Sequence, residues 1–253
     1  MIDLHTHLLP GVDDGADTAA QALAVLAKFA EQGVSAVCCT PHLKASESAD
    51  APCAELDAAL AELRAMAPAS PRLVRGFEVM LDVPQPDLRD RGLTLGGTRY
   101  VLVEFGRLMP PEAGAEVLGR IAAQGLVPIL AHPERYSSCS VETARRWRDA
   151  GALLQVDATT LLAESRRAER ARTLLAAGQA SIIASDNHGD GRTVLAGMEW
   201  VARHGGEVQA RLLAEDNPAA ILADAEVAPV PPMRMRRSWY SLLKDFVIGG
   251  KEA

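Results

Sequence analysis

Short apolar segments alternate with longer amphipathic segments along most of this chain, and this alternation constrains its fold more than any other feature. The short segments are almost uninterrupted runs of Val, Leu, Ile and Ala, which is typical of parallel strands buried on both faces. The longer segments repeat apolar residues at helical spacing. Seven strand-then-helix units of this kind predict an α/β fold, either a (β/α) barrel or a doubly wound sheet.

The expected elements follow one another closely. Strands are predicted at 2–7, 34–40, 73–78, 100–105, 126–132, 153–156 and 180–184. Helices are predicted at 18–32, 53–66, 113–124, 141–150, 164–177, 193–204, 207–215 and 217–222. Segment 82–97 is rich in Pro, Asp and Gly, and is expected to be a loop with a small hairpin.

The composition argues against several classes of protein. A length of 253 residues, of which 48% are hydrophobic, suits two small domains or one barrel-sized domain. A net charge of −7 argues against a general nucleic-acid binder, which carries a basic face. The four cysteines lack zinc-finger spacing, and the chain has neither a signal peptide nor an apolar run of about 18 residues. We therefore expect a soluble, cytoplasmic protein.

Two histidines mark the end of the first strand. His5 and His7 are two residues apart, so their imidazoles project from the same face of a strand. Two neutral imidazoles on one face can hold a divalent metal. A polar strand end in a turn-rich N-terminus explains the pair equally well, so the pair by itself leaves both interpretations open.

Later strands also end in side chains that bind metals. In a parallel barrel the carboxyl ends of the strands share one mouth, where catalytic groups gather. Such a repetition of metal-binding groups at strand ends is not expected by chance. Asp13 and Asp14 lie in the loop after the first strand, and the other candidates are His42, Glu78, Glu104, His132, Asp186 and His188.

The types of candidate ligand indicate the chemistry. A mixture of His, Asp and Glu without Cys favours Mn²⁺, Fe or Zn²⁺ in a hydrolytic site over a structural zinc site. With Asp13 and Asp14 counted as alternatives, nine candidates are too many for one ion, and two or three ions bridged by carboxylates such as Glu78 and Asp186 fit better. Such a cluster lowers the pKa of a bridging water and stabilises both oxygens of an in-line phosphoryl displacement.

Five motifs carry a resemblance to a known family. They are Asp3-Leu-His-Thr-His, Thr40-Pro-His, Phe77-Glu, Ala131-His-Pro-Glu-Arg and Ser185-Asp-Asn-His, and together they resemble the PHP (polymerase and histidinol phosphatase) superfamily. This resemblance implies a distorted seven-stranded, TIM-like (β/α) barrel with a trinuclear metal centre. Within the superfamily, Pro10-Gly-Val-Asp-Asp-Gly, Glu104 and the His-Pro-Glu-Arg-Tyr motif resemble the bacterial tyrosine-protein phosphatases of capsule and exopolysaccharide synthesis.

The resemblance also implies roles for individual residues. Arg135 and Arg192 would bind the substrate phosphate, a role that suits the bidentate hydrogen bonding of guanidinium groups. Asp14 would be both a metal ligand and a catalytic residue, and Asp13 beside it is the alternative ligand. The implied ligand groups are His5, His7, Glu78 and Asp186 for one metal, Glu78, Glu104 and His132 for a second, and Asp14, His42 and His188 for a third.

The activity expected from this resemblance is metal-dependent hydrolysis of phosphotyrosine in a protein. A hydroxide bridging two or three Mn²⁺ ions, with Fe or Zn²⁺ as alternatives, would attack phosphorus. The expected substrate is the tail of a membrane-associated bacterial tyrosine kinase that regulates capsular and exopolysaccharide synthesis and export. The alternative activity is that of a small-molecule phosphomonoesterase of the histidinol-phosphatase type on the same barrel.

A second phosphatase pattern occurs in the chain. Cys139 and Arg145 form a Cys-x5-Arg pattern, which is also found in the phosphate loop of cysteine-dependent tyrosine phosphatases. That loop presents consecutive backbone N–H groups, often with glycines, beside a cysteine of depressed pKa. This segment has no glycine, Glu142 would repel phosphate, and Ser140 begins an ordinary capped helix. We therefore interpret the pattern as a coincidence.

The C-terminal end of the chain differs from the rest. Residues 1–226 are expected to form the phosphatase barrel, and residues 227–253 a Pro-rich linker followed by a basic amphipathic helix. In that helix Trp239, Leu242 and Phe246 recur at helical spacing. Docking of the helix on the barrel is the simplest interpretation. Contact with a partner protein, a second subunit or a membrane surface is the alternative.

Overall fold

A computed structural model describes residues 1–106 and 109–234 of the chain. Its strands are β1 (Ile2–Thr6), β2 (Ala36–Cys39), β3 (His42–Lys44), β4 (Arg72–Arg75), β5 (Glu78–Leu81), β6 (Tyr100–Phe105), β7 (Val127–Ala131), β8 (Leu153–Asp157) and β9 (Ile182–Ala184). Its helices are α1 (Ala19–Glu31), α2 (Cys53–Met66), α3 (Pro111–Ala122), α4 (Val141–Asp149), α5 (Arg166–Ala176), α6 (Val194–Arg203), α7 (Glu207–Arg211) and α8 (Asn217–Leu222). A π-helical turn, Leu212–Asp216, joins the last two helices.

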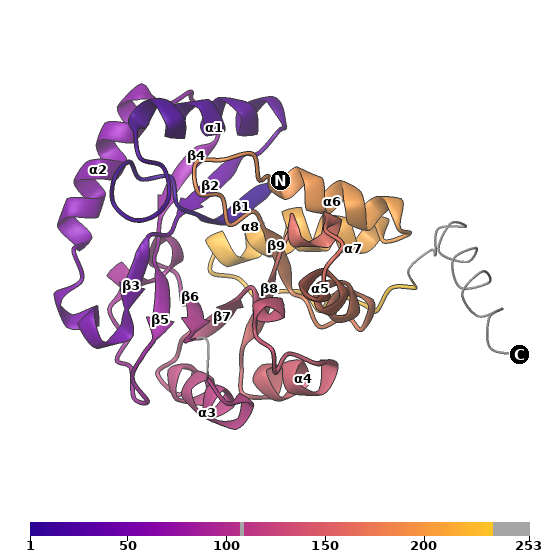
Figure 1. Ribbon diagram of the computed structural model, residues 1–253. Coiled ribbons are helices and arrows are strands. Elements are labelled where there is room, and N and C mark those ends of the chain that lie inside the picture. Colours follow the sequence, from indigo (N-terminus) through magenta and orange to yellow (C-terminus); the bar gives the residue numbers. More distant parts are fainter. Residues whose placement is uncertain (107–108, 235–253) are drawn as a thin grey trace, which may run out of the picture.

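The strands are parallel to their neighbours and lie in two sheets. The first sheet has the order β1-β2-β4, and the second has the order β3-β5-β6-β7-β8-β9. Helices α1 to α7 surround these strands on the outside (Figure 1). The predicted α/β class with parallel strands is therefore confirmed. The strand pairing gives two sheets, neither of which is closed, so the pairing by itself does not show the expected distorted seven-stranded barrel.

The strand predicted at 34–40 is divided between the two sheets. It ends at Cys39, and β3 begins at His42 in the other sheet. Pro41 lies at this break and has no N–H to donate to a ladder. The break therefore has a local cause that the apolar pattern of the segment does not reveal.

The strand predicted at 73–78 is divided in the same way, because β4 ends before Gly76 and β5 begins at Glu78. A β-carbon on Gly76 would lie 2.6 Å from the Leu95 side chain, so only glycine fits the close packing at this break. The two breaks bring His42 and Glu78 into register as neighbours in the β3–β5 ladder. Both residues therefore begin a strand instead of ending one.

The predicted hairpin in segment 82–97 is absent from this fully described part of the chain. Two short 3₁₀ turns, Arg91–Leu93 and Leu95–Gly97, take its place. The segment packs through Leu88, Leu93 and Leu95, which are all buried. Burial of three leucines thus decides the path of a segment that its Pro and Gly content predicted only as a loop.

Two apolar clusters hold the elements together. The larger cluster lies between strands and helices and includes Leu26 of α1 and Trp147 of α4. The smaller cluster combines side chains from strands of both sheets, namely Leu4, Cys38, Val74, Leu102, Ile129 and Ile182, with Ile221 of α8. Both sheets therefore enclose one common interior.

Residues 227–234 lie against the rest of the structure. The Ala228 N–H donates to Asn217 Oδ1 over 3.1 Å, and the Met233 N–H donates to the Ala176 carbonyl over 3.1 Å. Val230 and Met233 are buried. The predicted amphipathic helix that begins near Trp239 lies outside the described residues. Within the described part of the chain, none of the helices has the length and apolar character needed to cross a membrane.

Candidate metal centre

The nine predicted metal ligands come together in space. Their ligand atoms form four groups, within each of which all atoms lie within 4.8 Å of one another. The groups are His5, His7 and Asp186; His5, Glu78 and His132; His42, Glu78 and Glu104; and His7, Asp14, His42 and His188. Groups that share members in this way form one continuous cluster.

The centre of the cluster is a cage of two imidazoles and two carboxylates. The Nε2 atoms of His5 and His7 are 3.1 Å apart. Glu78 Oε2 lies 3.2 Å from the first and 3.4 Å from the second, and Asp186 Oδ1 lies 3.3 and 3.5 Å from them. Such spacings of about 3 Å are those of neighbouring ligands on an ion with bonds of about 2.1 Å.

Among the residues that the structure describes, two buried carboxylate oxygens of this cage have no hydrogen-bond donor. They are Glu78 Oε2 and Asp186 Oδ1, and both residues are about 1% exposed. A buried anionic oxygen without a partner costs free energy, which a cation between the four ligand atoms would recover. The donor set and the unsatisfied oxygens therefore fit a resident divalent metal.

Glu78 also connects the cage to its neighbours. Its Oε1 lies 2.8 Å from His132 Nε2, and its Oε2 lies 3.1 Å from His42 Nδ1. Glu104 completes this side, with Oε1 at 3.6 Å from the same His42 nitrogen. A carboxylate with oxygens in two groups is suited to bridge two metal ions.

The two adjacent aspartates have different surroundings. Asp14 Oδ1 lies 3.3 Å from His42 Nε2 and 3.4 Å from His188 Nε2, and so faces the outer group of ligand atoms. Asp13 instead accepts a hydrogen bond from His7 Nδ1 over 2.6 Å, on the side of that ring away from the cage. This geometry favours Asp14 as the ligand and gives Asp13 the role of orienting His7.

Gln155 orients His5 in the same way, a role that its position in the sequence did not predict. The His5 Nδ1–H donates to Gln155 Oε1 over 2.9 Å, which directs Nε2 into the cage. Gln155 is completely buried in the apolar strand β8. A lone amide in a strand that is otherwise Leu-Leu-x-Val is the one signal that could have indicated it.

Sharp backbone turns aim two of the ligands. His132 has a φ of 33° and Asp186 a φ of 50°, values in the left-handed region that side chains with a β-carbon rarely adopt. Each such residue costs about 1 to 3 kcal/mol, which the surrounding packing must offset. His132 directly follows the end of β7, and Asp186 is the second residue after the end of β9.

The cage holds opposite charges close together. Burial would lower the pKa of His5, but the carboxylates of Glu78 and Asp186 outweigh it and raise that pKa to about 9. Burial is likewise outweighed at His7, where the carboxylates of Asp13 and Asp186 raise the pKa to about 11. The carboxylates therefore favour the protonated rings, and a metal that binds the Nε2 atoms competes with those protons.

A cavity of about 540 Å³ opens beside the cluster. Arg135, Phe105, Tyr136 and Arg167 line it together with seven of the nine ligand residues. The Arg135 guanidinium contacts Asp186 and also lies 3.4 Å from Asp157 Oδ2. These contacts hold the guanidinium at the wall of the cavity.

Arg192, the second predicted phosphate-binding residue, lies on the same side of the cluster. Its Nη1 is 3.6 Å from Asp186 Oδ2, while its Nε donates to Asp190 over 2.8 Å. Both predicted arginines therefore converge on Asp186. Arg192 is also tied to a neighbouring acid, so it is less free to move than an unpaired arginine.

Comparison with known proteins identifies the family. The model of the family described as "Capsular polysaccharide synthesis, CpsB/CapC" matches residues 1–223. The chain belongs to the CpsB/CapC family. This membership confirms the resemblance that the motifs carry.

Several relatives of this CpsB/CapC chain are curated or solved. Tyrosine-protein phosphatase YwqE of Bacillus subtilis (strain 168) is 30% identical over 139 residues, which are 53% of this chain and 55% of YwqE. Tyrosine-protein phosphatase CpsB of Streptococcus pneumoniae is 27% identical over 240 residues, which are 88% of this chain and 99% of CpsB. A crystal structure from work on YwqE and CpsB, described as metal-dependent tyrosine phosphatases, matches with a TM-score of 0.73 and 24% identity over 94% of this chain and 100% of that chain. This structural likeness supports the fold.

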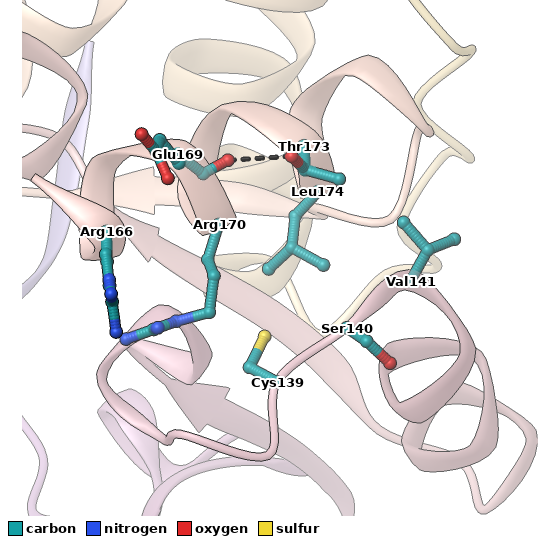
Figure 2. A pocket seen from close by; sticks show the side chains of 8 residues that line it. All are labelled: Cys139, Ser140, Val141, Arg166, Glu169, Arg170, Thr173 and Leu174. Atoms are coloured by element: carbon teal, nitrogen blue, oxygen red, sulfur yellow. Dashed lines mark hydrogen bonds between the residues drawn. The ribbon is translucent and has the colours of Figure 1, made fainter.

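The Cys-x5-Arg pattern of this CpsB/CapC chain does not form a phosphate loop. Ser140 caps α4 by accepting a hydrogen bond from the Thr143 N–H, so the segment is a helix start. Cys139 is only 6% exposed, and burial raises the pKa of its thiol to about 12. Figure 2 shows its sulfur turned towards α5. None of the residues that line this pocket is a predicted metal ligand.

Cys139→Ser is therefore expected to leave turnover of a phosphotyrosine substrate within about twofold of wild type, because a protonated, buried thiol is no nucleophile. Steady-state kinetics of the purified variant measure this, with circular dichroism as the control for folding. A loss of turnover in a folded variant that keeps its metal would reinstate the cysteine as nucleophile.

Proposed function

We propose that this member of the CpsB/CapC family is a metal-dependent protein-tyrosine phosphatase. The observation that carries the proposal is the convergence of nine His, Asp and Glu side chains in four overlapping groups beside one cavity. The names of the relatives YwqE and CpsB, both tyrosine-protein phosphatases, support it.

In this proposal two or three Mn²⁺ ions, with Fe or Zn²⁺ as alternatives, are held by the nine ligand residues. When bound, such ions supply a Lewis acid that activates water and neutralises charge on the phosphoryl group. The nitrogen and oxygen donors suit all three metals, so availability decides between them as much as affinity does. Asp13 and Gln155 keep the rings of His7 and His5 in the orientation that this requires.

Arg135 and Arg192 bind the phosphate in this proposal. Both guanidinium groups lie beside Asp186 Oδ2. A phosphate dianion competes with this carboxylate for them, because a planar guanidinium can donate two parallel N–H hydrogen bonds to phosphate oxygens. The remaining contact of Arg135 with Asp157 holds the group in place while it binds substrate. These two arginines would also neutralise the equatorial oxygens as phosphorus is attacked.

The aromatic wall of the cavity favours an aryl phosphate. Phe105 and Tyr136 line the cavity, with ring centroids 5.3 Å apart. The Tyr136 hydroxyl accepts a hydrogen bond from the Phe105 N–H over 2.9 Å, which fixes both rings. Packing of a substrate phenyl ring on this pair gives phosphotyrosine an advantage over an aliphatic phosphate.

The two sheets form a distorted seven-stranded barrel in this proposal. With β2 and β3 counted as one strand, and β4 and β5 as another, seven strands follow in sequence. Thr6 bridges to Asn187, and the Asp186 N–H donates to the His5 carbonyl over 3.0 Å, so the last strand meets the first. The common interior of the two sheets supports the same arrangement.

Residues 1–226 are the phosphatase unit in this proposal, and residues 227–253 are the segment that follows it, of which 227–234 pack on that unit. The family match to residues 1–223 supports this boundary. The proposed substrate is the phosphorylated tail of a membrane-associated bacterial tyrosine kinase of capsule synthesis. The family description supports the part of this proposal that concerns capsule synthesis. A cytoplasmic location agrees with four cysteines that are all free thiols.

Removal of metal is expected to abolish the activity. Protein treated with a chelator should lose at least about 99% of its turnover of a phosphotyrosine peptide, because activation of water by metal contributes several kcal/mol. Addition of Mn²⁺ should restore the activity. Histidinol phosphate, assayed in parallel, tests the alternative: a preference for it of more than about tenfold would replace the proposed substrate. Activity that survives complete removal of metal would contradict the proposal.

A further inference from the structure

A groove outside the metal centre runs between the start of α4 and α5. It has a volume of about 330 Å³, and its lining residues are Cys139, Ser140, Val141, Arg166, Glu169, Arg170, Thr173 and Leu174 (Figure 2). We call it the α4–α5 groove. Cys139 and Leu174 are 6% and 1% exposed, so they form an apolar floor.

The α4–α5 groove adjoins the cavity of the metal centre. Ser137 and Arg167 line the cavity, while Cys139 and Arg166 line the groove. Arg170 joins the two, because its Nε donates to the Glu134 carbonyl over 2.8 Å, next to Arg135 in the chain. A peptide whose side chain enters the cavity would therefore lay its neighbouring residues along the groove.

The charges at this place are not balanced within the protein. Arg166, Arg167 and Arg170 take part in none of the salt bridges among the described residues, although the chain has a net charge of −7. Arg166 and Arg170 are four residues apart on α5, where like charges repel. In Figure 2 the Arg166 and Arg170 side chains extend towards the same end of the groove, and Glu169 lies above them on α5. An anion between the two guanidinium groups would relieve the repulsion.

We propose that the α4–α5 groove binds the peptide segment next to the phosphotyrosine, and that Arg166 recognises the carboxylate of an acidic residue in it. The proposal rests on the proposed function, because it names the class of peptide that the same active site selects. The methylene groups of that residue would pack on the apolar floor, and its carboxylate would bind to Arg166 and Arg170. The α4–α5 groove, which lies outside the metal centre, would then select phosphopeptides that carry an acidic residue.

Arg166→Glu tests this role of the groove. Arg166 is exposed at the first position of α5, after the cap Ser165, and an acidic residue is favourable at a helix N-terminus, so the variant is expected to fold. Two phosphotyrosine peptides that differ only in having Glu or Gln beside the tyrosine serve as substrates, with free phosphotyrosine as the third.

The wild type should have a KM for the Glu peptide about fivefold to tenfold below that for the Gln peptide. Arg166→Glu should abolish or reverse this preference and leave kcat/KM for free phosphotyrosine unchanged. Arg203→Glu, an identical charge change on α6 at a side chain that is 66% exposed, should keep the preference. Equal preference in wild type and Arg166→Glu would overturn the proposal.

A second variant fills the groove without a change of charge. Thr173→Trp should raise KM for both peptides by roughly fivefold and not affect free phosphotyrosine, because the indole occupies space that the peptide needs. An unchanged KM for both peptides would place them elsewhere on the surface. If the wild type hydrolyses none of the three substrates, the proposed function fails. Fluorescence anisotropy of the labelled Glu peptide then tests the groove by itself, and equal binding to wild type and Arg166→Glu overturns it.

Discussion

Asp186→Asn is expected to lower kcat for a phosphotyrosine peptide by about 100-fold to 1000-fold, because one ligand of a hydrolytic metal supplies several kcal/mol of transition-state stabilisation. Asp186 Oδ1 lies 3.3 and 3.5 Å from the Nε2 atoms of His5 and His7, at the centre of the cage. A neutral amide there has the same shape but cannot balance the charge of a divalent ion. Metal content should fall together with kcat, which elemental analysis of the purified variant measures.

The fold should survive this change. Asparagine tolerates the left-handed backbone, with a φ of 50°, that Asp186 adopts. Without this carboxylate, Glu78 Oε2 still lies 3.2 and 3.4 Å from the Nε2 atoms of His5 and His7, so both rings keep a carboxylate partner. Arg135 retains its contact with Asp157.

His42→Ala provides an independent test of the same centre. The His42 side chain is 39% exposed, so its removal costs little stability, yet both of its nitrogens face carboxylates of the cluster. We expect a loss of activity similar to that of Asp186→Asn with an unchanged melting temperature. Turnover at the wild-type rate in either variant would show that the cluster is not the reaction centre.

Gly15→Ala is expected to have a large effect on both stability and activity. A β-carbon on Gly15 would lie 2.0 Å from the carbonyl oxygen of His7 and 2.4 Å from its Cβ, so the backbone itself has to move. Movement of this turn separates Asp13 from His7 and carries Asp14 away from the outer ligand group. Strain of this kind costs about 1 to 3 kcal/mol, or a melting temperature lower by about 5 °C, and kcat should fall at least about tenfold.

Gly191→Ala is the matched control for Gly15→Ala. A β-carbon on Gly191 would meet no heavy atom within 4 Å, although this glycine lies between Asp190 and Arg192 near the same centre. Calorimetry should therefore find Gly191→Ala within about 1 °C of wild type. If Gly15→Ala is equally harmless, the turn after β1 is not held by the close contact with His7.

The fold was predictable from sequence where the signal is local. Apolar runs such as 100–105 and 126–132 became strands β6 and β7 with shifts of one residue or less at most ends, because burial on both faces demands such runs. The apolar pattern did not predict the breaks after Cys39 and before Glu78. The first break has a local cause in Pro41, which the pattern does not include, and the second depends on the approach of Leu95 to Gly76, which are far apart in the chain.

The candidate site shows the same division. All nine ligand candidates are of types and at strand-associated positions that the sequence displays, and the structure places their ligand atoms in four groups. The partners that orient two of them are Asp13 for His7 and Gln155 for His5, and for Gln155 the only sequence signal is a lone amide in an apolar strand. A glutamine that is 150 residues from His5 becomes its neighbour only when β8 and β1 enclose the same interior.

The sequence by itself determined the α/β class, the family and the types of metal-binding side chain. These features depend on the spacing of residues within single strands, helices and motifs, which is visible in the sequence. Only the tertiary structure decided three features: the position of Asp14, and not Asp13, beside His42 and His188, the convergence of Arg135 and Arg192 on Asp186, and the presence of the α4–α5 groove beside the cavity. Each of these depends on distances between elements that packing sets and local pattern does not encode.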